Sequence, residues 1–457
     1  MEPTTNDRAA RSWNPDGLAM VGVVVATLVF WLWRVPAAQR GVVYAEDGEV
    51  FLLQWTWMQP GRALLEPYAG YQHLVPRILS GLADGLLPLE RYGLAVHVAS
   101  VLVLAAIAAA TVVLARDVVA SLLARVALAL VPVVLPLAGA EVLGNLANLH
   151  TYCLWLALWL LLWRPRAWWS AAFAAVAMLL ATMTEVQTVL LLPLAALRLA
   201  WMRERMVPIV AAFLVGVAGQ ATSWVLAPRA SPEDAGIDVA DVVVGWLVTA
   251  VRPILLPSDA AALATLRDVG PAPFLLVLLP FAAAVAVVLA WGDARQRVAS
   301  VATCLLSACL FGGSVLATPF SGFDWALREG DEWGTVMLNL RYGAAAGMWV
   351  AAQVPLAVGV LLDRLARGEH PSAPPMRAAR VAVGAVAVAL VATMAVIAPQ
   401  SGSVRDGGAG WLTEVDEGAL ACEAGAETVD LAIVPSGRLV TMACDELLER
   451  AVPGPGA

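Results

Sequence analysis

Two adjacent carboxylates, Glu46 and Asp47, lie in the acidic segment 44–49, directly before an amphipathic stretch from Val50 to Met58. At the start of a helix, a carboxylate is close to backbone N–H groups and to the positive end of the helix dipole, which favour its ionised form. There it can take a proton from an attacking hydroxyl, or hold a divalent cation against a phosphate. The alternative interpretation is that Asp47 only caps the helix and that Glu46 is solvated.

The segment 68–77 combines aromatic rings with hydrogen-bonding groups, a mixture that suits the binding of a sugar. Its candidate binding residues are Tyr68, Tyr71, His73 and Arg77. If a helix begins near Leu74, then His73 and Arg77 are four residues apart and face the same cavity. The alternative is a belt of aromatic residues at the level of the lipid headgroups.

Two further polar groups occur where the chain is otherwise apolar. The first group consists of Glu141, Asn145, Asn148, His150 and Tyr152, with Glu185 and Gln187 at the same level. The spacing predicts that Asn145 and Asn148 share one helix face, and polar groups at membrane depth tend to line cavities; simple capping is the alternative. The second group, Arg341-Tyr342, lies at the start of a late apolar run. There the arginine would bind a lipid phosphate; the alternative is that its side chain extends to the lipid headgroups.

The elements that must position these residues are membrane helices. The chain has 457 residues, of which 60% are hydrophobic and 14% charged, too few polar groups to cover a soluble protein. All 28 basic residues are arginine, which excludes enzymes that need a Schiff-base lysine or a lysine-bearing phosphate loop. The net charge of -8 argues against a nucleic-acid partner, because such proteins need clustered positive charge.

The sequence predicts an all-α polytopic membrane protein with about 11 transmembrane helices. A crossing needs roughly 20 mainly apolar residues. The apolar runs lie at 17–33, 93–115, 120–138, 147–163, 168–182, 186–201, 207–227, 273–291, 298–318, 342–363 and 379–398. We interpret the first run as an uncleaved helix, and the long stretch from Ala167 to Trp201, which is interrupted by polar residues, as a tight hairpin.

The distribution of charge predicts that the amino terminus is inside the cell. With this orientation the inner segments contain 15 arginines and 8 acidic residues, and the outer ones contain 13 and 28, as the positive-inside rule requires. The long outer segments are the loops 34–92, 228–272 and 319–341 and the tail 399–457. We therefore expect a transmembrane domain over 1–398, a small extracytoplasmic C-terminal domain of α/β or β type, and a site on the outer face.

The tail contains Cys422 and Cys444, which we predict to form a disulfide because the outside of the cell is oxidising. Two free thiols are the alternative. We expect two short strands between these cysteines, at Val429–Val434 and Leu439–Met442. The other cysteines fall inside apolar runs as small apolar side chains: Cys153, Cys304 and Cys309.

Together these features resemble the GT-C superfamily of membrane glycosyltransferases, which use polyprenyl-phosphate sugars as donors. The resemblance rests on about eleven spans, an acidic pair in a long first outer loop (Glu46-Asp47), interfacial helices in that loop, an Arg-Tyr pair opening a late span (Arg341-Tyr342) and a soluble outer C-terminal domain. It covers nearly the whole chain. The C-terminal domain is small beside the sugar-binding modules of the superfamily.

The resemblance implies that a first-loop carboxylate, Asp47 or Glu46, acts as general base on the acceptor hydroxyl while the polyprenyl phosphate leaves. The expected acceptor is a glycan, lipid or protein of the cell envelope, and the protein would lie among membrane lipids without a nucleic-acid partner. Some members hold a divalent cation, Mg or Mn, at this site, and Glu46 and Asp47 are the candidate ligands. A transporter or flippase of lipid-linked sugars, and an acyltransferase or lipid-linked polymer ligase, are the alternative functions.

Overall fold

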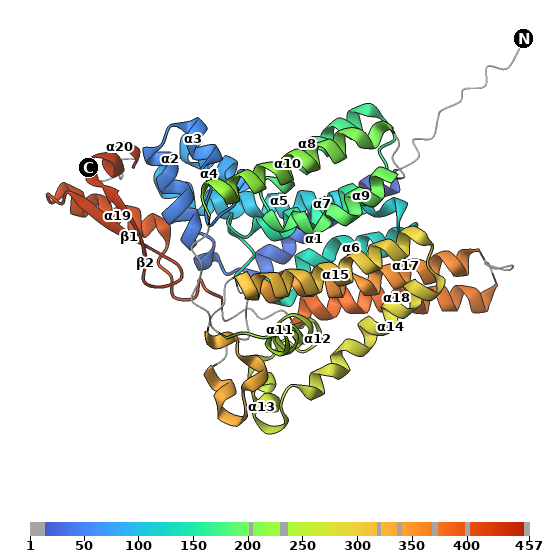
Figure 1. The fold of residues 1–457 in the computed structure, drawn as a ribbon. Coiled ribbons are helices and arrows are strands. Elements are labelled where there is room, and N and C mark those ends of the chain that lie inside the picture. The colour runs from blue at the N-terminus through green and yellow to red at the C-terminus, as the bar shows by residue number, and fades with distance from the viewer. Residues whose placement is uncertain are drawn as a thin grey trace, which may run out of the picture.

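The computed structural model describes residues 14–139, 141–200, 204–228, 236–317, 321–335, 341–367, 373–397 and 403–451. These residues form a mostly helical molecule with one small sheet (Figure 1). The first ten α-helices are α1 (Pro15–Arg34), α2 (Leu53–Trp57), α3 (Pro60–Leu65), α4 (Leu74–Leu86), α5 (Tyr92–Leu114), α6 (Leu122–Val134), α7 (Leu149–Leu162), α8 (Trp168–Thr182), α9 (Leu192–Ala200) and α10 (Val207–Leu226).

The second half of the chain adds further helices and the two strands. The helices are α11 (Val239–Gly245), α12 (Arg252–Leu255), α13 (Asp259–Val269), α14 (Leu275–Trp291), α15 (Ala294–Ala317), α16 (Arg341–Ala351), α17 (Gln353–Ala366), α18 (Pro374–Ile397), α19 (Trp411–Glu423) and α20 (Cys444–Arg450). The strands β1 (Thr428–Ile433) and β2 (Arg438–Ala443) pair antiparallel. Two further short helical segments are the π-helix η2 (Asp47–Leu52) and the 3-10 helix η6 (Val186–Leu191).

Seven helices of the described chain are long and apolar enough to cross a membrane. They cover Pro15–Arg34, Leu89–Asp117, Glu204–Leu226, Ala272–Trp291, Ala294–Ala317, Arg341–Ala366 and Pro374–Ile397. The other four predicted runs coincide with shorter apolar helices, at Leu122–Ala138, Leu149–Leu162, Trp168–Thr182 and Val186–Ala200. Length and composition therefore support a membrane protein.

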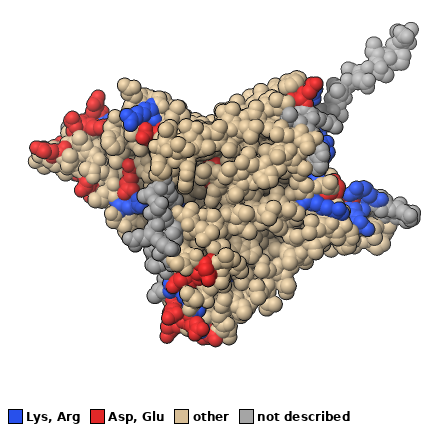
Figure 2. All heavy atoms as spheres, in the orientation of Figure 1, with Lys and Arg blue, Asp and Glu red and all other residues tan. Residues whose placement is uncertain are grey.

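Residues predicted to lie inside the cell meet at one end of the helices. Arg125 pairs with Asp16 at 2.9 Å, and Asp117 accepts a hydrogen bond from the Arg164 backbone at 2.8 Å. The backbone carbonyl of Asp117 also lies 3.3 Å from the guanidinium of Arg295. In Figure 2, blue atoms gather near the end of α17 and the start of α18, whereas red atoms gather over the C-terminal domain and around α13. The charge asymmetry of the sequence thus corresponds to two separate parts of the surface.

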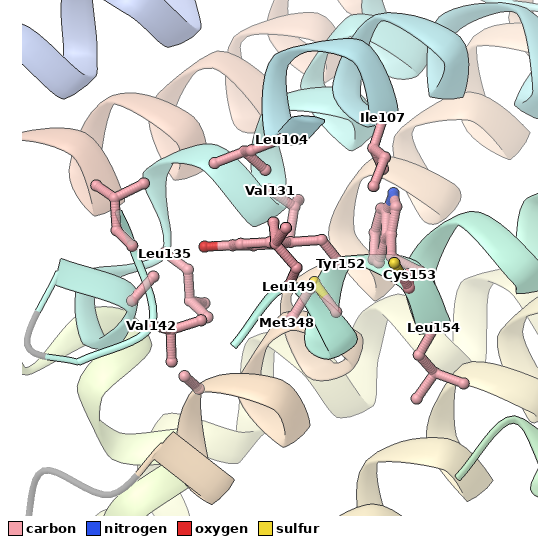
Figure 3. Close-up of a cluster of buried hydrophobic side chains, with 14 of the residues drawn as sticks. Leu104, Ile107, Val131, Leu135, Val142, Leu149, Tyr152, Cys153, Leu154 and Met348 are labelled. Carbon is pink, nitrogen blue, oxygen red and sulfur yellow. The ribbon is translucent and has the colours of Figure 1, made fainter. Parts of the chain in front are cut away.

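Buried aromatic and branched side chains fill the space between the central helices. Trp155 of α7 is fully buried, packs with its ring centroid 5.0 Å from that of Trp349 of α16 and donates to Thr111 of α5 at 3.0 Å. Figure 3 shows the neighbouring cluster, where Leu104, Val131, Tyr152 and Met348 converge from four different helices. Because a buried indole N–H needs an acceptor, the Trp155 bond fixes α7 against α5 as well as filling volume.

The C-terminal residues form a small unit of α19, β1, β2 and α20, held by the predicted disulfide between Cys422 and Cys444. The two expected strands are confirmed within a residue or two at each end. Alternation along β1 and β2 buries one face of the hairpin under α19, as expected for a two-stranded ribbon that cannot be stable alone.

This unit packs directly on the first long loop. The backbone of Val434 exchanges hydrogen bonds with Ala45 and Val43, at 2.6 and 3.0 Å. Trp411 is buried and donates through its indole to the Leu89 carbonyl at 2.7 Å, and Arg438 pairs with Glu49. The C-terminal unit therefore fixes the segment that carries Glu46 and Asp47.

Candidate functional site

A cavity of about 390 Å³ lies where the first long loop meets the ends of the central helices. Eight of the predicted site residues line it: Glu46, Tyr68, Tyr71, His73, Asn148, Glu185, Arg341 and Tyr342. The carboxyl ends of α10 and α15, which contribute Trp224 and Ser314, point toward the C-terminal unit in Figure 1. Residues from six distant parts of the sequence thus converge on one space.

The two adjacent carboxylates have different surroundings. Asp47 is buried, and its two oxygens accept hydrogen bonds from the backbone N–H groups of Leu146 and Ala147, both at 2.9 Å. Burial raises the pKa of Asp47 to about 7, and the two backbone N–H groups oppose that change. Asp47 therefore holds the turn 141–148 against the first loop, and its carboxylate caps this turn instead of its own helix.

Glu46 is the carboxylate of the pair that lines the cavity. Its Oε2 is buried and accepts no hydrogen bond from any residue that the structure describes. A buried acceptor without a partner is costly, and in native proteins it marks a functional group or a site for a ligand. Glu46 is thus the carboxylate of the pair that brings an unpaired oxygen to the lining of the cavity.

An aromatic wall faces Glu46 across the loop. Tyr68 and Tyr71 exchange two backbone hydrogen bonds, at 2.9 and 3.1 Å, around the left-handed pair Ala69 and Gly70. The Tyr71 ring lies 4.1 Å from the ring of His73. Burial, together with the nearby charges of His150 and Arg77, holds the pKa of His73 well below its usual range, so its ring is neutral. Flat neutral rings of this kind suit the apolar face of a sugar.

A buried amide network fixes this wall to the membrane helices. Gln220 of α10 accepts from the Gln72 backbone at 2.8 Å and donates to the Thr182 carbonyl at 2.8 Å. The Gln72 side chain donates to Ser223 at 2.9 Å. The helix α4 begins at Leu74, as predicted. The aromatic residues are therefore held on a rigid support, although they belong to a loop.

Arg341 enters the cavity beside an acidic group. Its guanidinium lies 3.2 Å from Glu141 and 3.3 Å from the hydroxyl of Tyr44, and Tyr44 donates to Glu141 at 2.5 Å. Burial raises the pKa of Tyr44, with the Glu141 charge acting in the same direction. Glu141 binds Arg341 from behind and is not among the residues that line the cavity. Glu141 thus holds the guanidinium of Arg341 in place at the cavity.

A second hydrogen-bonded chain crosses the opposite wall. His150 of α7 bonds through Nδ1 to Glu185, whose other oxygen accepts from the Gln187 backbone at 2.7 Å. The Gln187 amide then donates to Ser314 of α15 at 3.0 Å. Glu185 is buried, whereas the His150 side chain is 24% exposed. The imidazole is therefore held by a carboxylate and open to the cavity.

The remaining lining is apolar and comes from apolar helices. It includes Leu154 of α7, Leu190 of η6, Trp224 of α10 and Ala345 of α16. The cavity thus combines carboxylate, arginine and imidazole groups with hydrocarbon, a combination that fits a ligand with a polar head and an apolar tail.

Two sequence predictions about this region are wrong. Arg77 does not line the cavity with His73: it is fully buried, donates to the Ala63 carbonyl at 2.7 Å and stacks over Phe51 at 5.4 Å. Its long side chain turns into the loop, where the Ala63 carbonyl accepts from Nη1, while Nε and Nη2 are buried without a hydrogen bond among the described residues.

Asn145 and Asn148 do not share a helix face either, because α7 begins only at Leu149. In the preceding turn Asn145 donates to the Glu141 carbonyl at 2.5 Å and accepts from the Asn148 backbone at 2.8 Å. Asparagine side chains commonly replace backbone partners in this way. Asn148 still reaches the cavity.

Arg405 was not selected from the sequence, yet it is fully buried close to the site. Burial lowers the pKa of Arg405, and the Asp47 carboxylate is the leading charge that opposes the change. The C-terminal segment thus supplies a positive charge behind Asp47. A single arginine in a Gly- and Ser-rich stretch after the last apolar run was the available signal.

The described residues do not fit a bound divalent cation. Among them no group of three or more His, Cys, Asp or Glu is placed to hold a metal ion. Both oxygens of Asp47 are already occupied by backbone N–H groups, which leaves Glu46 as the single free carboxylate of the predicted pair.

Comparisons of the chain with protein-family models, with curated proteins and with solved structures give no match. The chemistry of the cavity is therefore the basis for a functional proposal.

Proposed function

We propose that the protein is an integral membrane glycosyltransferase of the GT-C type. It transfers a sugar from a polyprenyl-phosphate donor to a glycan, lipid or protein acceptor of the cell envelope, on the outer face of the membrane. The observation that supports this most is the composition of the cavity: an unpartnered Glu46 oxygen and aromatic rings on the loop side, and hydrocarbon from membrane helices on the other.

In the proposed reaction Glu46 is the general base. Its carboxylate takes the proton of the acceptor hydroxyl while that oxygen attacks the anomeric carbon, and the bond from this carbon to the phosphate oxygen breaks with its electrons on the phosphate. Asp47 is the positioning residue, because it fixes the loop of Glu46 to the turn 141–148. The guanidinium of Arg341 stabilises the negative charge that the leaving phosphate gains.

The proposal includes the topology predicted from the sequence. Seven long apolar helices and four shorter ones make up the proposed eleven crossings. With the amino terminus inside, the cavity, the long loops and the disulfide-bonded C-terminal unit are all on the outer side, where a disulfide persists.

The test is transfer of labelled sugar in membranes supplied with polyprenyl-phosphate donors, at matched protein levels. We expect Glu46→Gln to lower transfer by about 10²–10⁴-fold, because it removes the base and keeps the shape. Asp268→Asn is the matched control, since Asp268 is exposed on α13 far along the chain from the cavity residues. Full transfer by Glu46→Gln would rule out this base, and donor binding without turnover in the wild-type protein would favour a transporter.

A further inference from the structure

We infer that His150, oriented by Glu185, donates a proton to the departing lipid phosphate, so that the cavity contains a general acid in addition to the base Glu46. This inference rests on the proposed function and extends it to a second proton-transfer group.

The geometry that supports the inference is a buried carboxylate paired with a partly exposed imidazole. Glu185 caps η6 and is buried, and its two oxygens are occupied by Nδ1 of His150 and by the Gln187 backbone. Because a carboxylate only accepts, it fixes the hydrogen on Nδ1 and leaves Nε2 to exchange a proton with a ligand. A carboxylate in this position also stabilises the imidazolium form.

The position of His150 indicates that its proton goes to the phosphate of the donor and not to the acceptor. Leu154 follows His150 by four residues on α7 and therefore shares its helix face, and both line the cavity. Glu185 likewise precedes the apolar Val189 and Leu190 of the same wall. In the proposed function the lipid chain of the donor lies against this apolar wall, and the phosphate is the group attached to that chain. Glu46, in contrast, is on the loop side with the tyrosines.

Several other titratable groups face the same space. From the first loop these are Glu46, His73 and the tyrosines described above, from α15 it is Cys309, and from α16 they are Arg341 and Tyr342. Of these, Arg341 is a fixed charge that cannot exchange a proton near neutral pH. His73 is kept neutral by its burial, which leaves His150 as the imidazole able to carry the proton.

The acceptor O–H bond breaks and its proton goes to Glu46, a new bond forms between the acceptor oxygen and the anomeric carbon, and the bond from that carbon to the phosphate oxygen breaks. The imidazolium of His150 gives its Nε2 proton to the phosphate, which leaves as a protonated monoester. Water then takes the proton from Glu46 and returns one to His150.

The first measurement is nitrogen NMR of the full-length protein in detergent micelles, with labelled histidine. The chain has four histidines, so each signal can be assigned from single substitutions. We expect the neutral form of His150 to carry its hydrogen on Nδ1, and Glu185→Gln to shift this towards the other tautomer. Hydrogen on Nε2 in the wild-type protein would overturn the inference without any reference to activity.

The second measurement is the pH profile of kcat/KM for sugar transfer. We expect His150→Gln to lower kcat/KM by about 10²–10⁴-fold and to remove the alkaline limb of the pH profile. The kcat/KM of Glu185→Gln should lie between those of the wild-type protein and His150→Gln. Imidazole added to His150→Ala should restore part of the rate, which a folding defect would not allow. If the wild-type protein transfers sugar and His150→Gln keeps its rate and profile, the acid is wrong and the proposed function stands. If the wild-type protein transfers nothing, the proposed function itself fails.

Discussion

The carboxylates of Glu46 and Asp47 are adjacent in sequence, but the fold gives them separate tasks. Their residue types and position predicted a reactive carboxylate in the first loop, and Glu46 does line the cavity. The sequence left open which of the two would do so, because this depends on a turn one hundred residues later, at Leu146 and Ala147. Contacts of that range cannot be read from local spacing.

The first prediction concerns the bonds that Asp47 makes. Asp47→Ala leaves the N–H groups of Leu146 and Ala147 buried without an acceptor, which costs about 1–3 kcal/mol for each group. We expect a lower thermal unfolding midpoint in detergent. Glu417→Ala is the control, because Glu417 is exposed on α19. Equal midpoints for the two variants would show that Asp47 does not hold the turn.

The second prediction is a dependence of stability on pH. The pKa of Asp47 is raised to about 7 in the folded protein from 3.8, so between these values the folded state keeps a proton that the unfolded state has lost. Stability therefore falls as pH rises from about 4 to about 7 and is level above. Asp47→Asn should flatten this part of the curve, as followed by the unfolding midpoint at each pH. If the unfolding midpoint of Asp47→Asn depended on pH as steeply as that of the wild-type protein, the pH dependence would come from other titratable groups.

At the scale of elements, apolar runs and amphipathic stretches predicted most of the helices, including α4 and the short strands. The turn 141–148 was missed, because its asparagines have the spacing of a helix face. Its geometry depends on Gly144, which has a φ of 84° and lies so close to His97 that a side chain would collide with the ring. A glycine among apolar residues was the only local signal.

The third prediction tests how the C-terminal unit is attached. Trp411 is buried, its ring centroid lies 6.3 Å from that of Tyr92, and its indole donates to the Leu89 carbonyl, so Trp411→Ala should cost about 3–5 kcal/mol. We expect lower thermal stability and weaker sugar transfer together, because the unit supports the loop of Glu46. Leu412→Ala is the control, since Leu412 is 54% exposed. Loss of thermal stability without loss of sugar transfer would show that the C-terminal unit does not support the loop of Glu46.

At the scale of the whole molecule, composition and charge predicted a membrane protein with an arginine-rich end and an acidic end, and both ends are visible on the surface (Figure 2). The convergence of eight predicted residues on one cavity was not predictable, because it depends on how α7, α10, α15 and α16 pack. Arg77 shows what sequence spacing cannot predict, which is the direction that tertiary packing gives to a side chain. Its helical spacing from His73 was right, but burial under Ala63 and Phe51 directs it away.

The fourth prediction concerns orientation in the membrane. In a variant without Cys153, Cys304 and Cys309, cysteines introduced as Arg166→Cys and Glu417→Cys are both at exposed positions. A thiol reagent that cannot cross membranes should label intact cells only through Glu417→Cys, and should reach Arg166→Cys after permeabilisation. The opposite pattern would place the cavity on the inner face.

The most direct measurement uses the purified protein in liposomes with a labelled polyprenyl-phosphate sugar and an envelope acceptor fraction. We predict that labelled sugar appears on the acceptor together with an equal amount of sugar-free polyprenyl phosphate, and that Glu46→Gln abolishes both. Donor that is bound, or moved intact across the bilayer, without release of polyprenyl phosphate would contradict the assignment of a transferase.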